Sequence, residues 1–306
     1  MILMFKMRRK VVIKTLPKVV WFENQKMWEV GYIKSILPDY KHIFLNRNMS
    51  LLKDIKSVKV FIINEDGHQD KYSEYKQIIE EYKPKLLIHL SDEYFKCQDI
   101  VEKLYPLCPD VWRQYPFKFY DFPGENVRVI PLGYKTGICE EIDRPIMIQE
   151  RKYFWSFIGN YKNKHNQKER DDRVKMIELF KKNNSNNFLD DATEDPYKIR
   201  EIYSDTIFVP IGLNLLSGKS DTTIKEEVYV DCLRTYEALV CGAIPVTINC
   251  KNTFDYPINP PIITADTYEE LFETLNSMSD EEINNKRNQL IIWWCDVIKE
   301  LRGTIV

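Results

Sequence analysis

The chain has 306 residues, of which 44% are hydrophobic and 13% aromatic, enough apolar surface for packed cores. Its 44 basic and 46 acidic side chains give a formal net charge of −2, which argues against a nucleic-acid-wrapping protein or a polybasic membrane binder. No run reaches the roughly 18 apolar residues of a membrane span, and the N-terminus lacks the charge order of a secretory signal. The seven cysteines include no Cys-x-x-Cys pair, so we expect reduced thiols and a soluble cytoplasmic protein.

The first half of the sequence alternates short apolar runs with segments of helical spacing. The apolar runs are typical of buried strands, and the helical segments repeat apolar residues every three or four positions. Such alternation predicts a mostly parallel sheet covered by helices. The expected strands are 19–22, 42–45, 58–63, 85–90 and 127–132, and the expected helices are 28–37, 72–82 and 95–104.

A charged, weakly periodic segment at 136–151 interrupts this pattern and predicts a linker. We therefore expect two α/β domains, 1–145 and 146–306, each close to the common domain size. Two alternatives remain for the last helix, which carries Trp293 and Trp294: it packs back on the first domain, or it belongs to the core of the second. The expected strands of the second half are 153–158, 206–211, 246–248 and 262–264, and its helices are 168–182, 196–203, 231–241, 268–278 and 281–301.

Residues 231–248 carry the most informative pattern in the chain. Arg234 and Glu237 lie one turn apart on a predicted helix that Gly242 ends, and the apolar strand 246–248 follows. An arginine can clamp a diphosphate, and a glutamate can accept both hydroxyls of a ribose. The pattern therefore suits a nucleotide-sugar site. The alternative is an ordinary helix-to-strand unit with a surface ion pair.

This stretch, with Arg-Thr-Tyr-Glu-Ala-Leu at 234–239 and Gly-Ala-Ile-Pro-Val at 242–246, resembles the C-terminal signature of exostosin-family glycosyltransferases. The resemblance is best over 153–248. It implies a GT-B fold, in which two Rossmann-like domains face each other across a cleft, and transfer from a UDP-sugar to a hydroxyl of a glycan with inversion. Eukaryotic exostosins usually carry a membrane anchor, which we do not expect here. The chain resembles instead the short soluble forms of large DNA viruses, which would place it in the host cytoplasm.

Candidate donor contacts cluster after the predicted strands of the second half, where open α/β sheets bind ligands. In the exostosin-like pattern a strand ending in Phe-x-Gly precedes a helix with a phosphate-binding arginine, and a later loop supplies small polar contacts. The basic residues near 170 are interspersed with acidic ones, so a solvated helix face is the alternative there. The candidate donor contacts are Gly159, Arg170, Arg173, Ser217, Gly218, Arg234 and Glu237.

Inverting transfer needs a base for the acceptor hydroxyl, and it must come from the first domain. Asp92, directly after the strand 85–90, is the favoured candidate, with Glu93 and Asp66 as competitors; a helix cap is the alternative role for Asp92. His89 is interpreted as a core histidine. The sequence contains no Asp-x-Asp triplet and no H-x₃-H spacing, so we expect no metal and assign the leaving group's charge compensation to Arg173 and Arg234.

The sequence thus predicts a metal-independent hexosyl- or pentosyltransferase with a nucleotide-sugar donor and a glycan acceptor. Two alternatives stay open: a fucosyltransferase-like enzyme that uses GDP-fucose, and a glycan-binding protein without catalysis on the same fold. An acceptor groove could use the aromatic side chains of Trp21, Trp28, Tyr32 or Trp112, most of which we expect to lie in the core.

Overall fold

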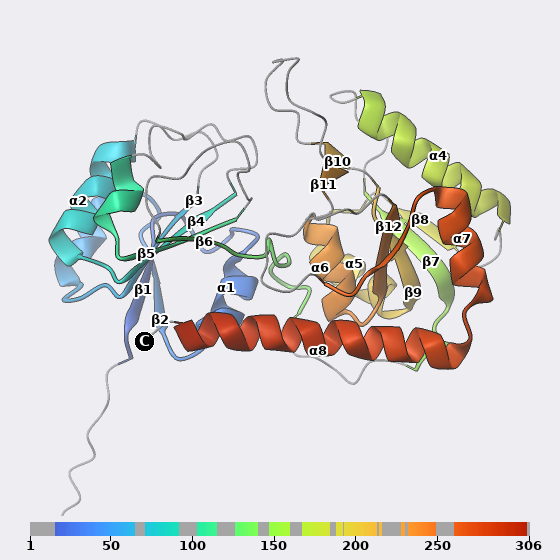
Figure 1. Ribbon diagram of the computed structural model, residues 1–306. Helices are drawn as coiled ribbons and strands as arrows, with labels where there is room; N and C mark the ends of the chain where they lie inside the picture. Colours follow the sequence, from blue (N-terminus) through green and yellow to red (C-terminus); the bar gives the residue numbers. More distant parts are fainter. Residues whose placement is uncertain are drawn as a thin grey trace, which may run out of the picture.

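The computed structural model describes most of the chain beyond residue 15. For residues 167–170, 188–191, 214–215 and 228–229 it describes the backbone alone. Within the described residues the chain forms two parallel β-sheets, each flanked by helices (Figure 1). The described residues are 16–64, 71–91, 103–114, 126–139, 147–159, 167–183, 188–191, 193–212, 214–215, 228–229, 232–248 and 260–304.

The first sheet has the strand order β2-β1-β3-β4-β5-β6, and every neighbouring pair is parallel. Its central strands β3 and β4 are mostly apolar, as expected for parallel strands whose sheet is covered by helices on both faces. Five strands overlap the predicted ones; β5 was not predicted. The strands are β1 (Lys18–Trp21), β2 (Lys41–Phe44), β3 (Val60–Asn64), β4 (Leu86–Leu90), β5 (Asp110–Arg113) and β6 (Val127–Val129).

The second sheet has the order β13-β12-β9-β7-β8, again with parallel neighbours only. A two-stranded antiparallel ribbon, β10 (Asn214–Leu215) with β11 (Val228–Tyr229), lies outside it. Strand β8 was not predicted, and the other four strands overlap predicted ones. The strands are β7 (Tyr153–Ile158), β8 (Phe188–Asp191), β9 (Thr206–Pro210), β12 (Ile244–Ile248) and β13 (Ile263–Ala265).

Helices cover the sheets, and their ends follow local signals. Helix α5 begins after Asp195, whose side chain accepts the backbone N–H of Tyr197, and Pro196 occupies its first position. Helix α2 ends at Tyr82, and the next residue, Lys83, caps it in the left-handed conformation with φ +45°. The α-helices are α1 (Val30–Ile36), α2 (Tyr72–Tyr82), α4 (Gln167–Asn183), α5 (Pro196–Ser204), α6 (Leu233–Val240), α7 (Tyr268–Ser277) and α8 (Asp280–Thr304), and the 3-10 helices are η1 (Met49–Asp54), η3 (Tyr105–Leu107) and η4 (Ile148–Glu150).

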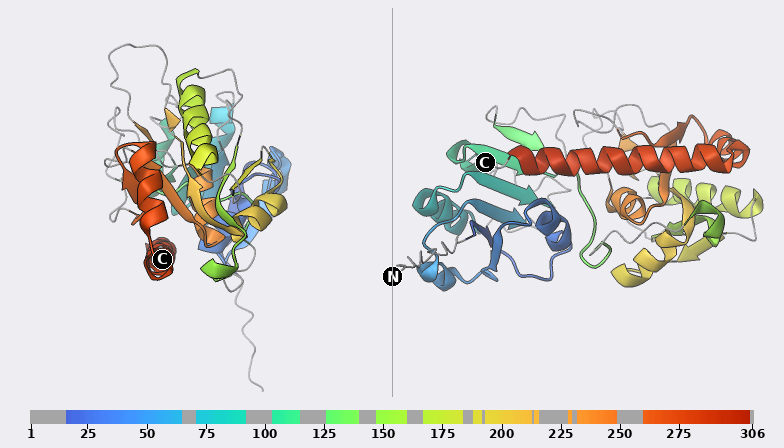
Figure 2. Two further views of the ribbon diagram at one scale, coloured as in Figure 1. Left: turned by 90° about the vertical axis from the view of Figure 1, so that its right-hand side faces the viewer. Right: turned by 90° about the horizontal axis from the view of Figure 1, so that it is seen from below.

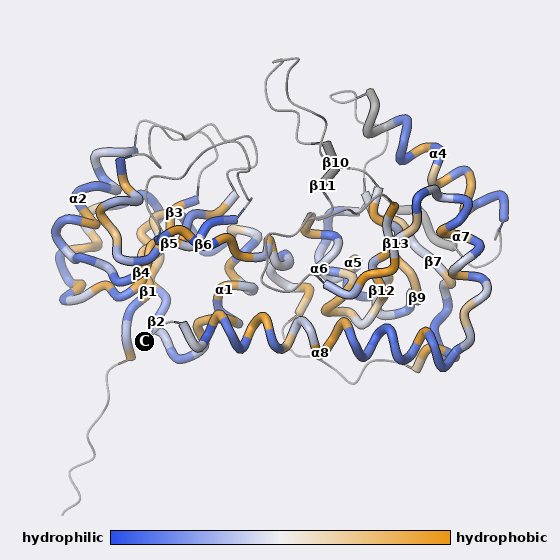
Figure 3. The backbone as a smooth tube through the Cα atoms, in the orientation of Figure 1, coloured by the Kyte–Doolittle hydropathy of each residue, from blue (hydrophilic) through white to orange (hydrophobic). Residues whose placement is uncertain are grey.

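Helix α8 runs along both sheet units, as the views of Figures 1 and 2 agree. Its tryptophan Trp294 stacks on Tyr32 of α1, with ring centroids 6.0 Å apart, and packs on Tyr236 of α6 at 5.2 Å. Near its end, Arg302 Nε donates to the carbonyl of Ser35 at 3.0 Å. Apolar and hydrophilic stretches alternate along the helix in Figure 3. This helix therefore ties the two units together.

The core follows the alternation of side chains along the strands. One apolar cluster is continuous from one face of the first sheet, where it includes Val19, through α8 to the second sheet, where it includes Trp155. A second cluster, which includes Val20 and Phe61, covers the other face of the first sheet. The predicted domain division at residue 145 falls within 140–146, outside the described residues, and stays a prediction.

Candidate functional site at the carboxyl edges of the sheets

The carboxyl edge of the second sheet brings two glycines close together. Gly159 follows β7 and Gly212 follows β9, and these strands are parallel neighbours. Because the carboxyl ends of parallel strands meet at one edge, both glycines lie where α/β sheets bind ligands. Each glycine has an arginine side chain packed directly on it.

Arg234, in the first turn of α6, is held in place by three contacts at the end of β7. Its Nε atom donates to the carbonyl of Ile158 at 2.7 Å. The guanidinium carbon lies 4.7 Å from the ring centroid of Phe157, a cation–π distance. A Cβ atom on Gly159 would collide with the Nη2 atom. Glycine at 159 is therefore what lets the guanidinium lie across the strand end.

Arg173 repeats this arrangement from helix α4. A Cβ atom on Gly212 would come within 2.8 Å of its Cγ atom, so the aliphatic part of Arg173 lies on the backbone at the end of β9. Arg173 and Arg234 are both half-buried. Two guanidinium-bearing side chains from different helices thus cover neighbouring strand ends, a donor arrangement suited to the oxygens of a diphosphate.

Glu237 lies one turn after Arg234 and is 4% exposed. Its carboxylate accepts a hydrogen bond from the backbone N–H of Lys135, a residue of the segment that follows β6. Its Oε1 atom has no hydrogen-bond partner among the described residues. Burial raises the pKa of Glu237, and the nearby charges of Lys135 and Arg234 oppose that rise. Glu237 therefore faces the first unit of the molecule, with one acceptor atom open to further bonding.

The structure thus brings four of the predicted donor contacts, Gly159, Arg173, Arg234 and Glu237, to one region. Arg170 belongs to α4, but only its backbone is described. The role of these residues as donor contacts stays a prediction. The remaining candidates lie outside the described residues: Ser217, Gly218, Asp92, Glu93 and Asp66.

The carboxyl edge of the first sheet carries a hydrogen-bonded chain of polar side chains that sequence reasoning missed. Glu29, at the start of α1 and 5% exposed, accepts a short hydrogen bond from the Ser91 hydroxyl. The Ser91 backbone N–H donates to Gln114 Oε1 at 2.9 Å, and Gln114 Nε2 donates to the Leu132 carbonyl at 2.8 Å. Burial raises the pKa of Glu29. These hydrogen bonds hold Ser91, the residue directly before Asp92, in a left-handed conformation with φ +60°.

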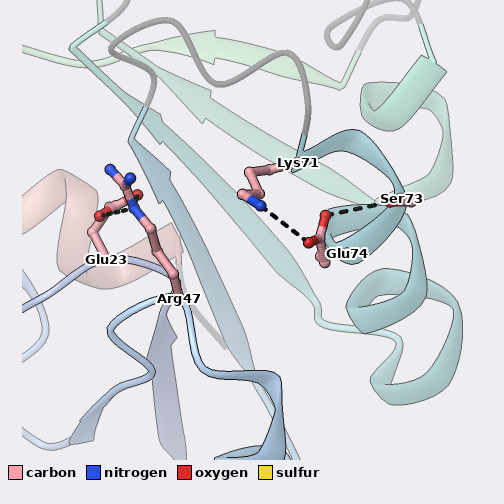
Figure 4. Close-up of polar contacts among 5 residues, drawn as sticks. All are labelled: Glu23, Arg47, Lys71, Ser73 and Glu74. Carbon is pink, nitrogen blue, oxygen red and sulfur yellow. Dashed lines mark hydrogen bonds and ion pairs between the residues drawn. The ribbon is translucent and has the colours of Figure 1, made fainter.

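An ion pair joins the ends of β1 and β2 at the same edge. Arg47 Nε lies 2.9 Å from both carboxylate oxygens of Glu23 (Figure 4). The Glu23 side chain is 9% exposed and that of Arg47 is 45% exposed. Further along, Lys71 and Ser73 contact the carboxylate of Glu74 at the start of α2. Carboxylates at this edge thus have basic or hydroxyl partners from the chain itself.

His89 lies inside the first sheet, which confirms its interpretation as a core residue. It is 1% exposed, and its Nδ1 atom is 2.6 Å from the Tyr105 hydroxyl and 3.1 Å from Arg113 Nη1. Because an arginine only donates, Nδ1 accepts and the ring proton is on Nε2. Burial and the charge of Arg113 hold the pKa of His89 well below its usual value. His89 is therefore neutral at physiological pH and is no base for a substrate.

The structure separates the four aromatic candidates for sugar stacking. Trp21, Tyr32 and Trp112 are buried in the core, as expected for most of these residues, and are not available to a ligand. Trp28 is 55% exposed. Their sequence context does not distinguish them, because burial depends on packing against α8 and the neighbouring strands.

Neither a metal centre nor a membrane-spanning helix is found in the part of the chain that the structure describes. The histidine, cysteine and carboxylate side chains there form no group suited to hold a metal ion; the expectation of metal independence stays a prediction. None of the described helices combines the length and apolar character that a membrane crossing requires.

Comparisons with known proteins concern the whole chain. No protein-family model and no curated protein sequence matches it. Among solved structures it is similar to an α-glucosyltransferase (AGT) in complex with UDP, with 11% identity, 95% of this chain and 100% of that chain covered, and a TM-score of 0.52. A glycosyltransferase from Rickettsia africae ESF-5 matches with 10% identity, 95% and 100% coverage and a TM-score of 0.40. The lipopolysaccharide outer core galactosyltransferase WaaB, apo form, matches with 9% identity, 94% and 98% coverage and a TM-score of 0.42.

The first of these likenesses spans both parallel sheets and α8. Together with the two-sheet topology, it confirms the predicted α/β class. The chain has a GT-B fold.

Proposed function

We propose that the chain is an inverting glycosyltransferase that moves a sugar from a UDP-sugar to a hydroxyl of a glycan acceptor without a metal ion. The observation that carries this proposal is the pair of arginines, Arg173 and Arg234, packed on the glycines that end neighbouring strands. Fixed guanidinium groups stabilise the charge that develops on a leaving diphosphate. In this role they replace the divalent cation that other transferases use.

Glu237 supports a nucleotide donor in particular. Its buried Oε1 atom lacks a partner among the described residues, and an unsatisfied buried carboxylate oxygen is costly unless a ligand fills it. A ribose hydroxyl is a donor of suitable size, one helical turn from the arginine that holds the diphosphate. The similar α-glucosyltransferase is in complex with UDP, which favours a uridine nucleotide.

In the proposed reaction a base removes the proton from the acceptor hydroxyl as its oxygen attacks the anomeric carbon. The carbon–oxygen bond to the diphosphate breaks, and UDP leaves with its charge held by the arginines. Asp92 remains our candidate base. It directly follows Ser91, whose hydrogen bonds to Glu29 and Gln114 hold Ser91 itself in place.

Membership of the exostosin family, the short viral form, the domain division at residue 145 and a contribution of Arg170, Ser217 and Gly218 to phosphate binding also stay predictions. The proposed donor contacts all lie after residue 145, which is consistent with the predicted domain division.

A nucleotide screen tests the proposal. UDP, GDP and CMP are added separately to the full chain, and the melting temperature is followed. A ligand that binds only the folded state adds about 2.7 kcal/mol at a hundredfold excess over its dissociation constant. We expect UDP to stabilise the chain, and Arg173→Met to reduce that shift, while Lys175→Met, at an exposed position of the same helix, does not.

The other outcomes separate the alternatives. A shift with GDP alone would favour the fucosyltransferase-like alternative. No shift with any nucleotide would reject a nucleotide-sugar donor and favour a glycan-binding protein.

A further inference from the structure

We propose that Trp28 is the platform on which a sugar ring of the acceptor stacks; this inference rests on the proposed function and adds the acceptor subsite to it. Trp28 is 55% exposed, and the other five of the six tryptophans in the chain are at most 6% exposed. A large exposed aromatic ring presents a flat apolar face to the C–H groups of a sugar. The buried tryptophans are Trp21, Trp112, Trp155, Trp293 and Trp294.

The backbone around Trp28 is held in place although its ring is exposed. The carbonyl of Trp28 accepts hydrogen bonds from Thr136 twice, from the backbone N–H at 2.6 Å and from Oγ1 at 2.8 Å. The same Oγ1 accepts the backbone N–H of Gly31 at 2.9 Å. Lys135 Nζ lies 4.4 Å from the centroid of the indole ring. An aromatic ring ordered in advance loses little conformational freedom when a ligand stacks on it.

The position of Trp28 connects the two carboxyl edges. It directly precedes Glu29, whose buried carboxylate belongs to the edge of the first sheet. The residue that covers its ring, Lys135, is also the residue whose backbone N–H binds Glu237. Lys135 thus contacts both the exposed indole of Trp28 and the carboxylate of Glu237, to which we assign the donor ribose. An acceptor sugar on Trp28 would therefore lie beside the donor.

The nucleobase of the donor is the competing occupant of this ring. We favour the acceptor because Trp28 belongs to the first sheet's unit, whereas Arg173, Arg234 and Glu237 all belong to the second.

The test uses the exposure of Trp28 as its signal. Iodide quenches exposed tryptophans, so in the full chain its effect reports on Trp28. The chain is first tested on an array of neutral oligosaccharides of glucose, galactose, mannose and N-acetylglucosamine, with UDP present. The tightest-binding oligosaccharide is then titrated in solution, with UDP alone as a parallel sample. We expect the oligosaccharide to protect the fluorescence from iodide and UDP alone to leave it quenchable.

Three variants accompany the titration. We expect Trp28→Ala to weaken oligosaccharide binding about tenfold and Trp28→Phe to weaken it less, because a smaller ring still stacks. Ile292→Ala, at an exposed apolar position on α8, should change nothing. The thermal shift caused by UDP should be equal in all three variants and in the parent chain, so this readout reports on the proposed function separately.

Several results would overturn the inference. If UDP stabilises the chain but no oligosaccharide binds, or Trp28→Ala binds as the parent does, the donor site stands and the Trp28 platform is wrong. If UDP alone protects Trp28, and Trp28→Ala loses the thermal shift, the nucleobase occupies the ring. If UDP does not stabilise the parent chain, the proposed function fails, and the inference that rests on it fails too.

Discussion

The two sheets of this molecule have the same parallel architecture but very different carboxyl edges. The edge of the second sheet carries arginine side chains lying on glycines, Arg173 on Gly212 and Arg234 on Gly159. The edge of the first sheet carries buried carboxylates that are already bonded, as in the pair Glu23–Arg47. One edge therefore presents arginine side chains suited to an anion, whereas the carboxylates of the other edge are bonded within the chain.

This contrast indicates that the fold provides the location of a site and the residues after each strand decide its ligand. Parallel strands followed by helices favour anions at both edges, because the helix N-termini point there. At the first edge the carboxyl group of Glu29, at the start of α1, occupies the position that an anion would take. At the second edge Glu237 accepts a backbone N–H from the other unit, and the arginines give this edge its positive charge.

The largest effect is expected from Arg234→Ala, which removes the guanidinium from the second edge. A charge-assisted hydrogen bond is worth about 1.5–3 kcal/mol, so we expect UDP affinity to fall roughly ten- to hundredfold in calorimetric titrations. Arg234→Lys should lie between, because it keeps the charge but loses the planar donor group that contacts Ile158.

The matched control lies on the first edge. Arg47→Ala also removes a half-exposed arginine, one that is paired with Glu23, and it should leave UDP affinity unchanged. Equal losses in Arg234→Ala and Arg47→Ala would contradict the division between the two edges.

A smaller loss is expected from Gly159→Ala, which tests the glycine rather than the charge. The new Cβ atom would collide with Arg234 Nη2. The group that must move is the end of a flexible side chain, so the fold should survive while the guanidinium is displaced. We expect about tenfold weaker UDP binding with a nearly unchanged melting temperature. Gly303→Ala, where the Cβ atom would meet nothing within 4 Å, is the control and should bind UDP normally; unchanged binding in Gly159→Ala as well would mean that the guanidinium position is irrelevant.

Local signals in the sequence were sufficient for much of this architecture. The apolar run of β4 and the glycine after α6 mark those elements without reference to the rest of the chain. Strands β5 and β8 have only two apolar residues each, Asp-Val-Trp-Arg and Phe-Leu-Asp-Asp. Their identity depends on pairing with β4 and β7, which no local pattern contains.

The site follows the same rule. The pattern around Arg234 and Glu237 was visible because both residues belong to one helix. The burial of Glu29 depends on Ser91, 62 positions later, and the partner of Glu237 is Lys135, from the other unit. Contacts between segments so far apart carry no signal in a single sequence.

The next prediction concerns thermal stability. It compares the two buried carboxyl groups, one from each edge, in the variants Glu237→Gln and Glu29→Gln. Burial raises both pKa values, so the folded state binds these protons more tightly than the unfolded chain does. The ionised forms therefore reduce the stability of the fold above the ordinary pKa of 4.5. We expect both variants to melt at a higher temperature than the parent chain at pH 7.5, and this gain to vanish as the pH falls toward that value.

The two variants should differ in ligand binding. Glu237→Gln loses the charge that accepts the ribose hydroxyls, so its UDP affinity should fall, whereas Glu29→Gln should keep the parent's affinity. A lower melting temperature in both variants at pH 7.5 would mean that the hydrogen bonds to the ionised carboxylates outweigh their desolvation.

The smallest effect is expected on the stability of the fold in acid. It compares the interiors of the two sheets rather than their edges. His89 lies inside the first sheet with a pKa held well below the ordinary 6.5, while the described strands of the second sheet contain no histidine. The unfolded chain takes up a proton on this ring below about pH 6.5 and the folded chain does not, so the stability is complete above that pH and declines below it.

One proton corresponds to about 1.4 kcal/mol of unfolding free energy per pH unit. We expect His89→Gln, which keeps an acceptor for Arg113 and Tyr105, to remove nearly this much from the slope of unfolding free energy against pH between about 6 and 5, measured by urea denaturation. His42 has its pKa lowered by burial as well, but it is less deeply enclosed, so His42→Gln should reduce the slope less. If the slope is the same in His89→Gln as in the parent chain, His89 is protonated in the fold, and the bond from Arg113 to its Nδ1 atom cannot exist as the structure has it.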